Sequence, residues 1–248
     1  MKDRKIILVT GASRGIGAAI AKNFNQNEFY IAVGYNKNKI LAQNIVDDIN
    51  SSGYKSKIFQ IDLSNSASIF NAHKEILNEW GEIDILINNA AISQEKPFLT
   101  ITEEDWDTML STNLKGPFLI SQCVLPAMMK KKWGRIVNIV SIGGQWGGIN
   151  QIHYASAKAG LIGLTKSLAK TFGSYGITVN AVSPGLVQTD MATNELVTEA
   201  GKEKIKNIPA GRIGTPQEIA SVVSFLSSNE SQYINGQTIN VNGGMYFG

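Results

Sequence analysis

A glycine-rich turn near the start of the chain restricts the possible folds more than any other feature of the sequence. Residues 10–17 read Thr-Gly-Ala-Ser-Arg-Gly-Ile-Gly, directly after the apolar run 6–9 and before the small apolar run 18–21. This order predicts a buried strand, a tight turn and the start of a helix. Glycine permits the unusual backbone angles and the close approach of a ligand, and the first N–H groups of the helix favour an anion. The turn therefore predicts a pyrophosphate site at its backbone N–H groups, among Gly11, Ser13, Arg14, Gly15, Ile16 and Gly17, with a glycine turn that binds no ligand as the alternative.

Strand-like and helix-like segments alternate along the whole chain. We expect strands near 5–10, 29–35, 56–61, 84–88, 135–141, 177–182 and 237–241, and helices near 15–27, 38–52, 66–79, 103–130, 152–173 and 215–227. This alternation predicts a parallel sheet, and right-handed crossovers then place helices on both of its faces. Ligands of such a sheet bind at the carboxyl ends of the strands. We therefore expect an α/β chain with a Rossmann fold and a seven-stranded parallel sheet.

Length and composition favour a single domain over residues 1–248. Hydrophobic residues make up 43% of the chain and charged residues 17%, which suits a large core. The net charge of +3 is too small to indicate nucleic-acid binding, and we interpret the lysine run 130–132 as a solvated loop. The run 6–9 is too short for a signal peptide, and no run approaches the length of a membrane span. We expect a cytoplasmic protein that binds neither nucleic acid nor membrane.

The cysteine and histidine residues predict neither a disulfide nor a metal site. Cys123 is the single cysteine, which excludes an internal disulfide and fits a reducing compartment. The two histidines, His73 and His153, do not complete a zinc cluster with it. We expect Cys123 to pack in an apolar helix and His153 to pack or to lie at the surface, with a place beside a pocket as its alternative.

Residues 186–214 form the least regular part of the sequence. Gly201, Pro209, Gly211 and Gly214 lie there among mixed polar residues. An irregular segment of this length in a compact domain is typical of a lid over a binding site. A flexible insertion without a role in binding is the alternative.

Tyr154 and Lys158 are spaced for the transfer of a proton. They lie four residues apart in the segment Tyr-Ala-Ser-Ala-Lys, so a helix would place the phenol and the ammonium on one face. A free tyrosine titrates near ~10, and a fixed cation lowers that pKa by stabilising the phenolate. The same spacing is common on solvated helices, so its significance depends on the glycine turn upstream.

Several motifs together resemble the short-chain dehydrogenase/reductase family. They are the turn 10–17, Asn88-Asn89-Ala90, Asn113, Ser141, Tyr154 with Lys158, and Pro184-Gly185, in the order and spacing of the single-domain members. The resemblance covers essentially the whole chain. It is closest to the bacterial 3-oxoacyl-[acyl-carrier-protein] reductases, through segments 113–116, 157–161, 176–180 and 236–244.

The resemblance implies a catalytic tetrad of Asn113, Ser141, Tyr154 and Lys158. Tyr154 would give a proton to the carbonyl oxygen of the substrate as hydride arrives from a nicotinamide. Ser141 would hold that oxygen, and Lys158 would lower the pKa of the tyrosine and bind the nicotinamide ribose. Asn113 is a poor helix former within a helical stretch, so we expect it to distort the helix and to seat a water for proton relay.

The end of the second strand predicts which nicotinamide cofactor the chain prefers. NAD-binding members carry a carboxylate there, whereas residues 34–37 read Gly-Tyr-Asn-Lys. Arg14 and Lys37 are placed to bind a 2′-phosphate, so we expect NADP(H) rather than NAD(H), with two merely solvated cations as the alternative. Asp62 and Leu63 would contact the adenine. The other implied cofactor contacts are Asn36, Asn88, Ala90, Ile139, Pro184, Gly185, Val187 and Thr189, besides Tyr154 and Lys158.

Two departures from the resemblance bear on the substrate. Ala91 stands where the family has glycine, which adds a methyl group beside the cofactor cleft. Of two basic positions that flank the cleft of the carrier-protein reductases, Lys132 keeps one and Tyr175 occupies the other. This weakens the expectation of an acyl carrier protein as partner without removing it.

Three functions remain open from the sequence. The first is NADPH-dependent reduction of a 3-oxoacyl thioester linked to acyl carrier protein or coenzyme A. The second is the reduction or oxidation of another ketone, sugar or secondary alcohol, which a pocket lined by Gln145, Trp146 and Gln151 would also suit. The third is an NADP-binding sensor or scaffold without turnover, which the intact tetrad disfavours. By family analogy, helix 217–227 with Glu218 and the last strand pair subunits in a homotetramer.

Overall fold

A seven-stranded sheet forms the centre of the computed structural model, which describes residues 4–24, 29–189 and 199–248. The strand order is β3-β2-β1-β4-β5-β6-β7, and every pairing is parallel. The strands are β1 (Lys5–Val9), β2 (Phe29–Tyr35), β3 (Lys55–Gln60), β4 (Ile85–Asn88), β5 (Gly134–Ile139), β6 (Ile177–Pro184) and β7 (Thr238–Val241). All seven expected strands are present, and the predicted fold class is confirmed.

The direction of strand addition reverses at β1. The chain passes from β1 outward through β2 to β3, and then returns to the other side of β1 to form β4. There Ile7 pairs with Ile85 and Val9 with Ile87. Such a reversal opens a crevice at the carboxyl ends of the two strands, because the connections leave on opposite faces of the sheet. The glycine turn follows β1 directly into this crevice.

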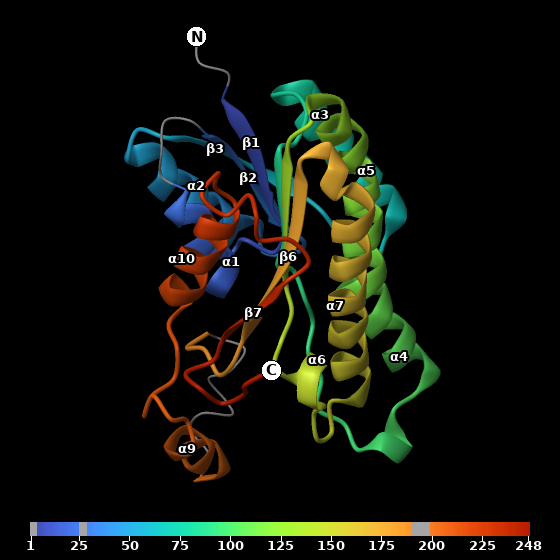
Figure 1. Cartoon of the computed structure of the whole chain (residues 1–248), viewed down its shortest axis with the longest axis vertical. Coiled ribbons are helices and arrows are strands. Elements are labelled where there is room, and N and C mark those ends of the chain that lie inside the picture. Colours follow the sequence, from blue (N-terminus) through green and yellow to red (C-terminus); the bar gives the residue numbers. More distant parts are fainter. Residues whose placement is uncertain (1–3, 25–28, 190–198) are drawn as a thin grey trace.

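Two layers of helices cover the sheet (Figure 1). One layer, at the left of the view, contains α1 (Gly15–Asn23), α2 (Lys39–Ser51) and α10 (Pro216–Leu226). The other, at the right, contains α3 (Ser66–Glu79), α5 (Gly116–Lys131) and α7 (Ile152–Phe172). The shorter elements are η1 (Phe98–Thr100), α4 (Glu103–Leu110), η2 (Ser111–Lys115), α6 (Gly143–Trp146), η3 (Gly173–Tyr175) and α9 (Glu199–Lys206). No helix in the described ranges has both the length and the apolar character that crossing a membrane requires.

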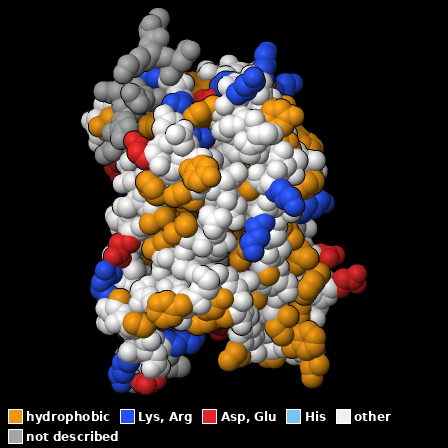
Figure 2. Space-filling view, in the orientation of Figure 1, with side chains coloured by type: hydrophobic (Ala, Val, Ile, Leu, Met, Phe, Trp, Pro, Cys, Tyr) orange, Lys and Arg blue, Asp and Glu red, His pale blue; other side chains and the backbone are white. Residues whose placement is uncertain are grey.

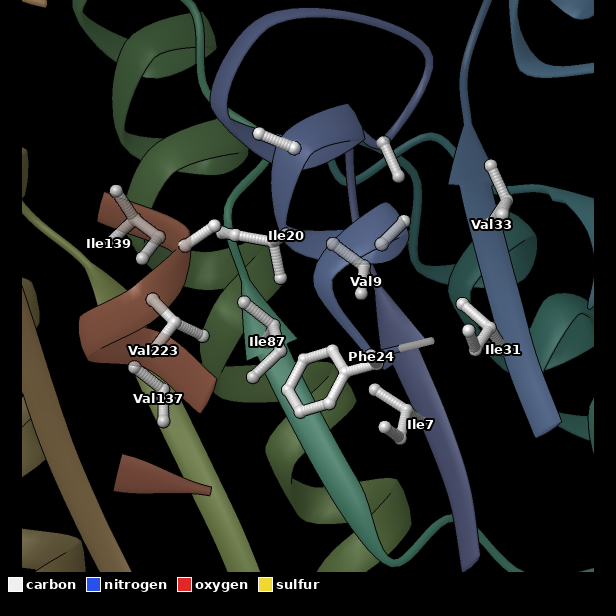
Figure 3. Packing of buried hydrophobic residues seen from close by; sticks show 14 of the residues in the cluster. Ile7, Val9, Ile20, Phe24, Ile31, Val33, Ile87, Val137, Ile139 and Val223 are labelled. Atoms are coloured by element: carbon white, nitrogen blue, oxygen red, sulfur yellow. The ribbon is translucent and has the colours of Figure 1, made fainter. Parts of the chain in front are cut away.

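The strands alternate between two hydrophobic layers. Ile7 and Val9 of β1 belong to the layer beneath α1 and α10, whereas Leu8 belongs to the layer beneath α3 and α5. Figure 3 shows the first layer, in which Ile20 of α1 and Val223 of α10 pack over the strands. All five side chains are buried, and each contributes about 1.5–3 kcal/mol relative to exposure. This packing fixes α1, and with it the glycine turn.

The expected helix over 103–130 is three segments. α4 ends at Leu110, the π-helical η2 follows, and α5 begins at Gly116. Pro117 lies in the first turn of α5, where its missing N–H group interrupts no helical hydrogen bond. The apolar pattern runs through the whole stretch, so periodicity alone does not reveal the break.

Two other expected segments lie partly outside the described residues. The helix expected over 15–27 ends at Asn23, and residues 25–28 are not described. Of the lid expected over 186–214, residues 190–198 are not described, and α9 occupies part of the remainder. Residues 208–210 pack on the C-terminal segment, since the N–H of Ala210 donates to the Gly243 carbonyl at 2.9 Å.

Large apolar side chains are exposed around α4. They are Phe98 and Leu99 of η1, Trp106 of α4 and Phe118 of α5, and Leu99 is 93% exposed. In Figure 2, apolar side chains gather at the lower right, over the region where Figure 1 places α4. An apolar surface of this kind is typical of a contact with another protein surface.

Candidate active site

The glycine turn packs against the segment that follows β4. An ideal Cβ at Gly11 would lie 2.7 Å from the Cα of Ala90, and one at Gly17 would lie 2.4 Å from the Gly11 carbonyl oxygen. Gly11 and Gly15 also have positive φ angles of 64° and 57°, which side chains disfavour. The glycines are therefore needed for internal packing as well as for the approach of a ligand. The predicted residues Ser13, Arg14 and Ile16 lie on the same turn.

Thr10 and Asn89 hold this turn in place. The Thr10 hydroxyl donates to the Ile87 carbonyl at 3.2 Å and accepts from the N–H groups of Asn89 and Ala90, both at 3.0 Å. The Asn89 amide donates to the carbonyls of Thr10 at 2.9 Å and Gly11 at 3.1 Å. Neither residue was among the predicted site residues. The Asn-Asn-Ala motif indicates that an asparagine contacts the turn, but it does not indicate which of the two does so.

The Asn88 side chain belongs to a buried polar network between the sheet and α7. Its amide donates to the Asn138 side chain at 2.8 Å, and Asn138 donates in turn to the Thr165 hydroxyl at 2.8 Å. Asn88 pairs with Asn138 in the register between β4 and β5, so both side chains point to the same face of the sheet. The side chain is committed to this network, and a contact between Asn88 and the cofactor stays a prediction.

The proposed 2′-phosphate residues lie at the same edge of the sheet. Arg14, Asn36 and Lys37 are all exposed, and the Ala12 N–H donates to the Gly34 carbonyl at 2.8 Å, which joins the glycine turn to β2. No carboxylate occurs among residues 34–37. This part of the crevice therefore presents two cations where an acidic side chain would favour unphosphorylated ribose.

Asp62 and Leu63 follow β3, the strand that pairs with β2. One Asp62 carboxylate oxygen accepts from the N–H and the hydroxyl of Ser64, at 2.9 and 2.7 Å, and no hydrogen bond within the described part of the chain uses the other. Leu63 is buried, and its backbone packs on Gly116, where an ideal Cβ would lie 2.6 Å from the Leu63 carbonyl oxygen. The second carboxylate oxygen thus keeps its capacity to accept from an adenine amine.

The segment after β6 forms the opposite wall of the crevice. Pro184 ends β6, and Gly185 has no room for a side chain because an ideal Cβ would lie 2.9 Å from the Asn242 Cβ. Val187 forms an isolated parallel bridge with Gly214. The Thr189 methyl group lies 3.5 Å from an ideal Cβ at Gly15. The structure therefore brings the predicted residue Thr189 across to the glycine turn.

Asn113 lies in the π-helical η2 and is fully buried. Its amide pairs in both directions with the backbone of Ile92, since the Ile92 N–H donates to Oδ1 at 2.9 Å and Nδ2 donates to the Ile92 carbonyl at 2.8 Å. The expected distortion of the helix is confirmed, because a π-helical turn replaces the regular α-helical turn. The side chain fixes the segment after β4 at the crevice.

Ser141 and Tyr154 meet at the carboxyl end of β5. The Ser141 hydroxyl lies close enough to act on the pKa of the phenol, and its oxygen also accepts from the Gly143 N–H at 3.1 Å. Burial raises the pKa of Tyr154 above its ordinary value, and the Ser141 hydrogen bond offsets this in part. Tyr154 therefore holds its proton at neutral pH.

Lys158 is buried one helical turn after Tyr154, and its ammonium contacts the end of β5. Its Nζ donates to the Ile139 carbonyl at 2.7 Å and lies 5.7 Å from the centre of the Tyr154 ring. Burial lowers the pKa of Lys158 to about 8. Desolvation of the phenol is the largest effect on the pKa of Tyr154, and the expectation that the Lys158 cation lowers this pKa stays a prediction.

The expected indole and amide pocket is only partly formed. Gln145 donates to the Ser183 hydroxyl at 2.8 Å and to the Asn240 side chain at 2.6 Å, so its amide joins α6 to β6 and β7. Trp146 is half exposed and packs edge-on against Tyr246, with ring centres 5.9 Å apart. The Trp146 indole remains accessible to a substrate, whereas the Gln145 amide is committed to the fold.

Comparison with known proteins decides the family. A family model described as Enoyl-(Acyl carrier protein) reductase matches residues 11–246. The chain belongs to the short-chain dehydrogenase/reductase family. The 3-oxoacyl-[acyl-carrier-protein] reductase FabG of Salmonella typhimurium is 45% identical over 244 residues, 98% of each chain. That of Staphylococcus aureus is 41% identical over 246 residues, 99% of this chain and 100% of the relative. A crystal structure of a proposed gluconate dehydrogenase from Agrobacterium tumefaciens has a TM-score of 0.92 at 32% identity, covering 97% of this chain and 95% of that one.

The residues of this short-chain dehydrogenase/reductase fit a nicotinamide dinucleotide. Members of the family are oxidoreductases that act on CH–OH or C=O groups and bind such a cofactor, which supplies or accepts hydride when bound. α1 begins at Gly15, and Arg14 before it makes no side-chain capping hydrogen bond to the first N–H groups of the helix. These groups suit an anion such as the pyrophosphate. Lys158, with its Nζ in the crevice beyond β5, would hold the ribose.

Proposed function

We propose that this protein reduces a 3-oxoacyl thioester to the 3-hydroxyacyl form with NADPH. The observation that supports this most is the approach of the Ser141 and Tyr154 hydroxyl groups to one another at the carboxyl end of the sheet. A carbonyl oxygen bound there would meet two donors as it gains negative charge. Relatives that share 41–45% of their residues with this chain are named 3-oxoacyl-[acyl-carrier-protein] reductases, which favours the thioester as substrate.

Tyr154 is the acid in this reaction. Its raised pKa keeps the phenol protonated until it is needed. As the carbonyl carbon accepts hydride, the O–H bond of Tyr154 breaks and its proton passes to the carbonyl oxygen. Lys158 stands one helical turn away, and its positive charge stabilises the phenolate that remains. A water held near Asn113 would return the proton.

NADPH rather than NADH is the hydride donor in this proposal. Arg14 and Lys37 flank the end of β2, and residues 34–37 include no carboxylate to repel a phosphate. A guanidinium and an ammonium at this position would each form a charge-assisted hydrogen bond with the 2′-phosphate. Unphosphorylated NADH would lose both interactions.

Tyr175 favours a second candidate function, the reduction or oxidation of another ketone, sugar or secondary alcohol. Lys132 and Tyr175 are both exposed, and a neutral phenol at the second position offers less attraction to an acidic carrier protein than a cation would. The exposed Trp146–Tyr246 pair would suit the apolar face of a ring. We keep acyl carrier protein as the preferred carrier and coenzyme A as the alternative.

A homotetramer is the proposed assembly. A groove of about 380 Å³ between α4, η2, α5 and α7 is lined mainly by Leu110, Leu114, Phe118 and Leu164, next to the exposed residues around α4. Phe225 of α10 is also exposed, on the helix expected to pair subunits. Burial of two apolar surfaces on each chain would give a closed assembly with two kinds of interface. Light scattering of the purified protein measures its mass directly.

Steady-state kinetics with both cofactors test the proposed function. We expect the kcat/KM for acetoacetyl thioesters with NADPH to exceed that for simple ketones and sugars by at least about tenfold, which is ~1.4 kcal/mol of transition-state discrimination. A higher kcat/KM for a ketone or sugar than for the thioester would support the second candidate function. Binding of NADPH without turnover of any carbonyl compound would indicate a sensor or scaffold.

A further inference from the structure

The segment after β4 contacts the neighbours of two tetrad residues. Ile92 pairs through its backbone with the Asn113 side chain. Two residues later, the Gln94 side-chain oxygen lies 2.8 Å from Nε2 of His153, which directly precedes Tyr154 in α7. Residues 92–94 therefore connect the π-helical turn that holds Asn113 to the first turn of the helix that carries Tyr154.

Asp105 determines which way the Gln94 amide faces. The carboxylate accepts from the Gln94 Nε2 at 3.0 Å, and it also forms an ion pair with Lys96 and caps α4 through Thr102. The Lys96 hydrogen bond, followed by that of the Thr102 N–H, holds the pKa of Asp105 well below its usual range, so this carboxylate can only accept. The Gln94 nitrogen must face Asp105, which turns the Gln94 oxygen toward His153.

This orientation defines the protonation of His153. Since the Gln94 oxygen can only accept, Nε2 of His153 must carry the hydrogen. His153 is fully buried, and its Nδ1 has no hydrogen-bond partner among the described residues. A hydrogen on Nδ1 would be a buried donor without a partner, which is unfavourable. The Nε2–H tautomer of His153 is therefore favoured, and its ring is held from one side by Gln94.

Further contacts anchor the same segment. The Lys96 N–H donates to the Asn150 carbonyl at 2.7 Å, and Gln151 donates to the Glu95 carboxylate at 3.2 Å. The first contact uses the backbone, and the second is exposed. Gln94 alone among these residues joins α4 to α7 through a side chain with partners at both ends.

We propose that Gln94 is a positioning residue for Tyr154, acting through the Nε2–H tautomer of His153. The proposal rests on the proposed function, in which Tyr154 delivers a proton to a bound carbonyl oxygen. A proton donor must lie within a few tenths of an ångström of its place, and a displacement of about 1 Å can reduce the rate ~100-fold. Gln94 restricts the first turn of α7 while Ile92 restricts Asn113, so one short segment sets the distance between the two.

The kinetic test compares Gln94→Met with Gln43→Met. Methionine keeps the approximate volume of glutamine but makes neither hydrogen bond, and Gln43→Met removes only the exposed bond to Asp47 on α2. We expect Gln94→Met to lower kcat about tenfold while the KM for NADPH stays near the wild-type value, and Gln43→Met to keep kcat. The melting temperature of Gln94→Met should fall by a few degrees, because the buried Nε2 of His153 loses its partner. A kcat for Gln94→Met within twofold of wild type would overturn the positioning role. A double variant, Gln94→Glu with Asp105→Asn, keeps an acceptor for Nε2–H of His153 and restores the bond between residues 94 and 105 with donor and acceptor exchanged, so it should recover part of the lost kcat.

A second measurement does not depend on turnover. The chain has two histidines, so the ¹⁵N NMR spectrum of the histidine-labelled protein contains two ring systems, and a His73→Gln variant assigns them. We expect His153 to show the Nε2–H tautomer near neutral pH and to become a mixture of tautomers in Gln94→Met. An Nδ1–H or doubly protonated ring in the wild type would overturn the proposal that Gln94 holds His153 in its Nε2–H tautomer. If the enzyme reduces no carbonyl compound, the proposed function fails, but this spectrum still decides the state of His153.

Discussion

Lys158 follows Tyr154 by one helical turn, yet its ammonium donates to the Ile139 carbonyl rather than to the phenol. The helix brings the two side chains to the same face, and the sheet then supplies a closer partner for the cation. Burial raises the pKa of Tyr154 and lowers the pKa of Lys158 to about 8. Both pKa shifts favour the neutral forms of the side chains. Tyr154 is therefore a neutral phenol before the substrate binds. A positive charge on Lys158 would favour the phenolate, and so would offset part of the effect of burial on the pKa of Tyr154.

Burial of Lys158 should make the stability of the protein depend on pH. The pKa of about 8 in the folded state is below the ordinary 10.5, so the unfolded chain binds more protons between these values. The free energy of unfolding should therefore rise with pH across this window, by up to ~3 kcal/mol from Lys158 alone. Below pH 8 both states are protonated, and the full cost of burying the charge is present.

Urea unfolding of wild type and Lys158→Met at pH 7 and pH 10 measures this effect. The difference in unfolding free energy between the two proteins should shift in favour of wild type as the pH rises. Lys166→Met on the exposed face of α7 is the control, and its difference from wild type should not change with pH. An equal pH dependence in Lys158→Met and wild type would show that the buried amine has an ordinary pKa.

Gly17→Ala should destabilise the protein. The new Cβ would lie 2.4 Å from the Gly11 carbonyl oxygen and 2.5 Å from the Asn89 amide nitrogen, so the turn must move. Overpacking of this kind costs about 1–3 kcal/mol and should also weaken cofactor binding. Gly163→Ala on α7 is the matched control, because nothing lies within 4 Å of its ideal Cβ. That change should stabilise the helix by about 0.5–1 kcal/mol. Similar melting temperatures for the two variants would contradict the packing argument.

The sequence predicts the local parts of this site well. The glycine turn and the seven parallel strands depend on residue type and on spacing along the chain, and both could be predicted. The misfit of Asn113 in a helical stretch correctly indicated a distortion, which is the π-helical η2. Each of these inferences uses a backbone preference that nearby residues express.

The tertiary partners of the same residues could not be predicted. The bond from Lys158 to Ile139, the pairing of Asn88 with Asn138 and the double use of Gln145 all join residues far apart in the chain. Their geometry depends on strand register and on helix packing, which no local pattern records. The adjacent asparagines illustrate this, because only the direction of each side chain from β4 separates the buried Asn88 from Asn89 on the turn.

Lys37→Ala should change the choice of cofactor. If Lys37 binds the 2′-phosphate, its removal should weaken NADPH binding about tenfold and leave NADH binding nearly unchanged, since one charge-assisted hydrogen bond is lost. Isothermal titration with each cofactor measures both affinities. Arg14→Ala should act in the same direction, and the exposed Lys166→Ala should have no effect. Equal losses for NADPH and NADH would place Lys37 away from the phosphate.

Turnover of Tyr154→Phe is the most direct test of the central claim that this phenol delivers the proton. The change removes a single oxygen and keeps the ring in the first turn of α7. We expect kcat with an acetoacetyl thioester to fall by at least about 1,000-fold, while the Kd for NADPH stays within about twofold. Tyr233→Phe, at a fully exposed phenol, should keep wild-type activity. If Tyr154→Phe retained more than about a tenth of the wild-type kcat with its fold and cofactor affinity intact, Tyr154 would not be the acid.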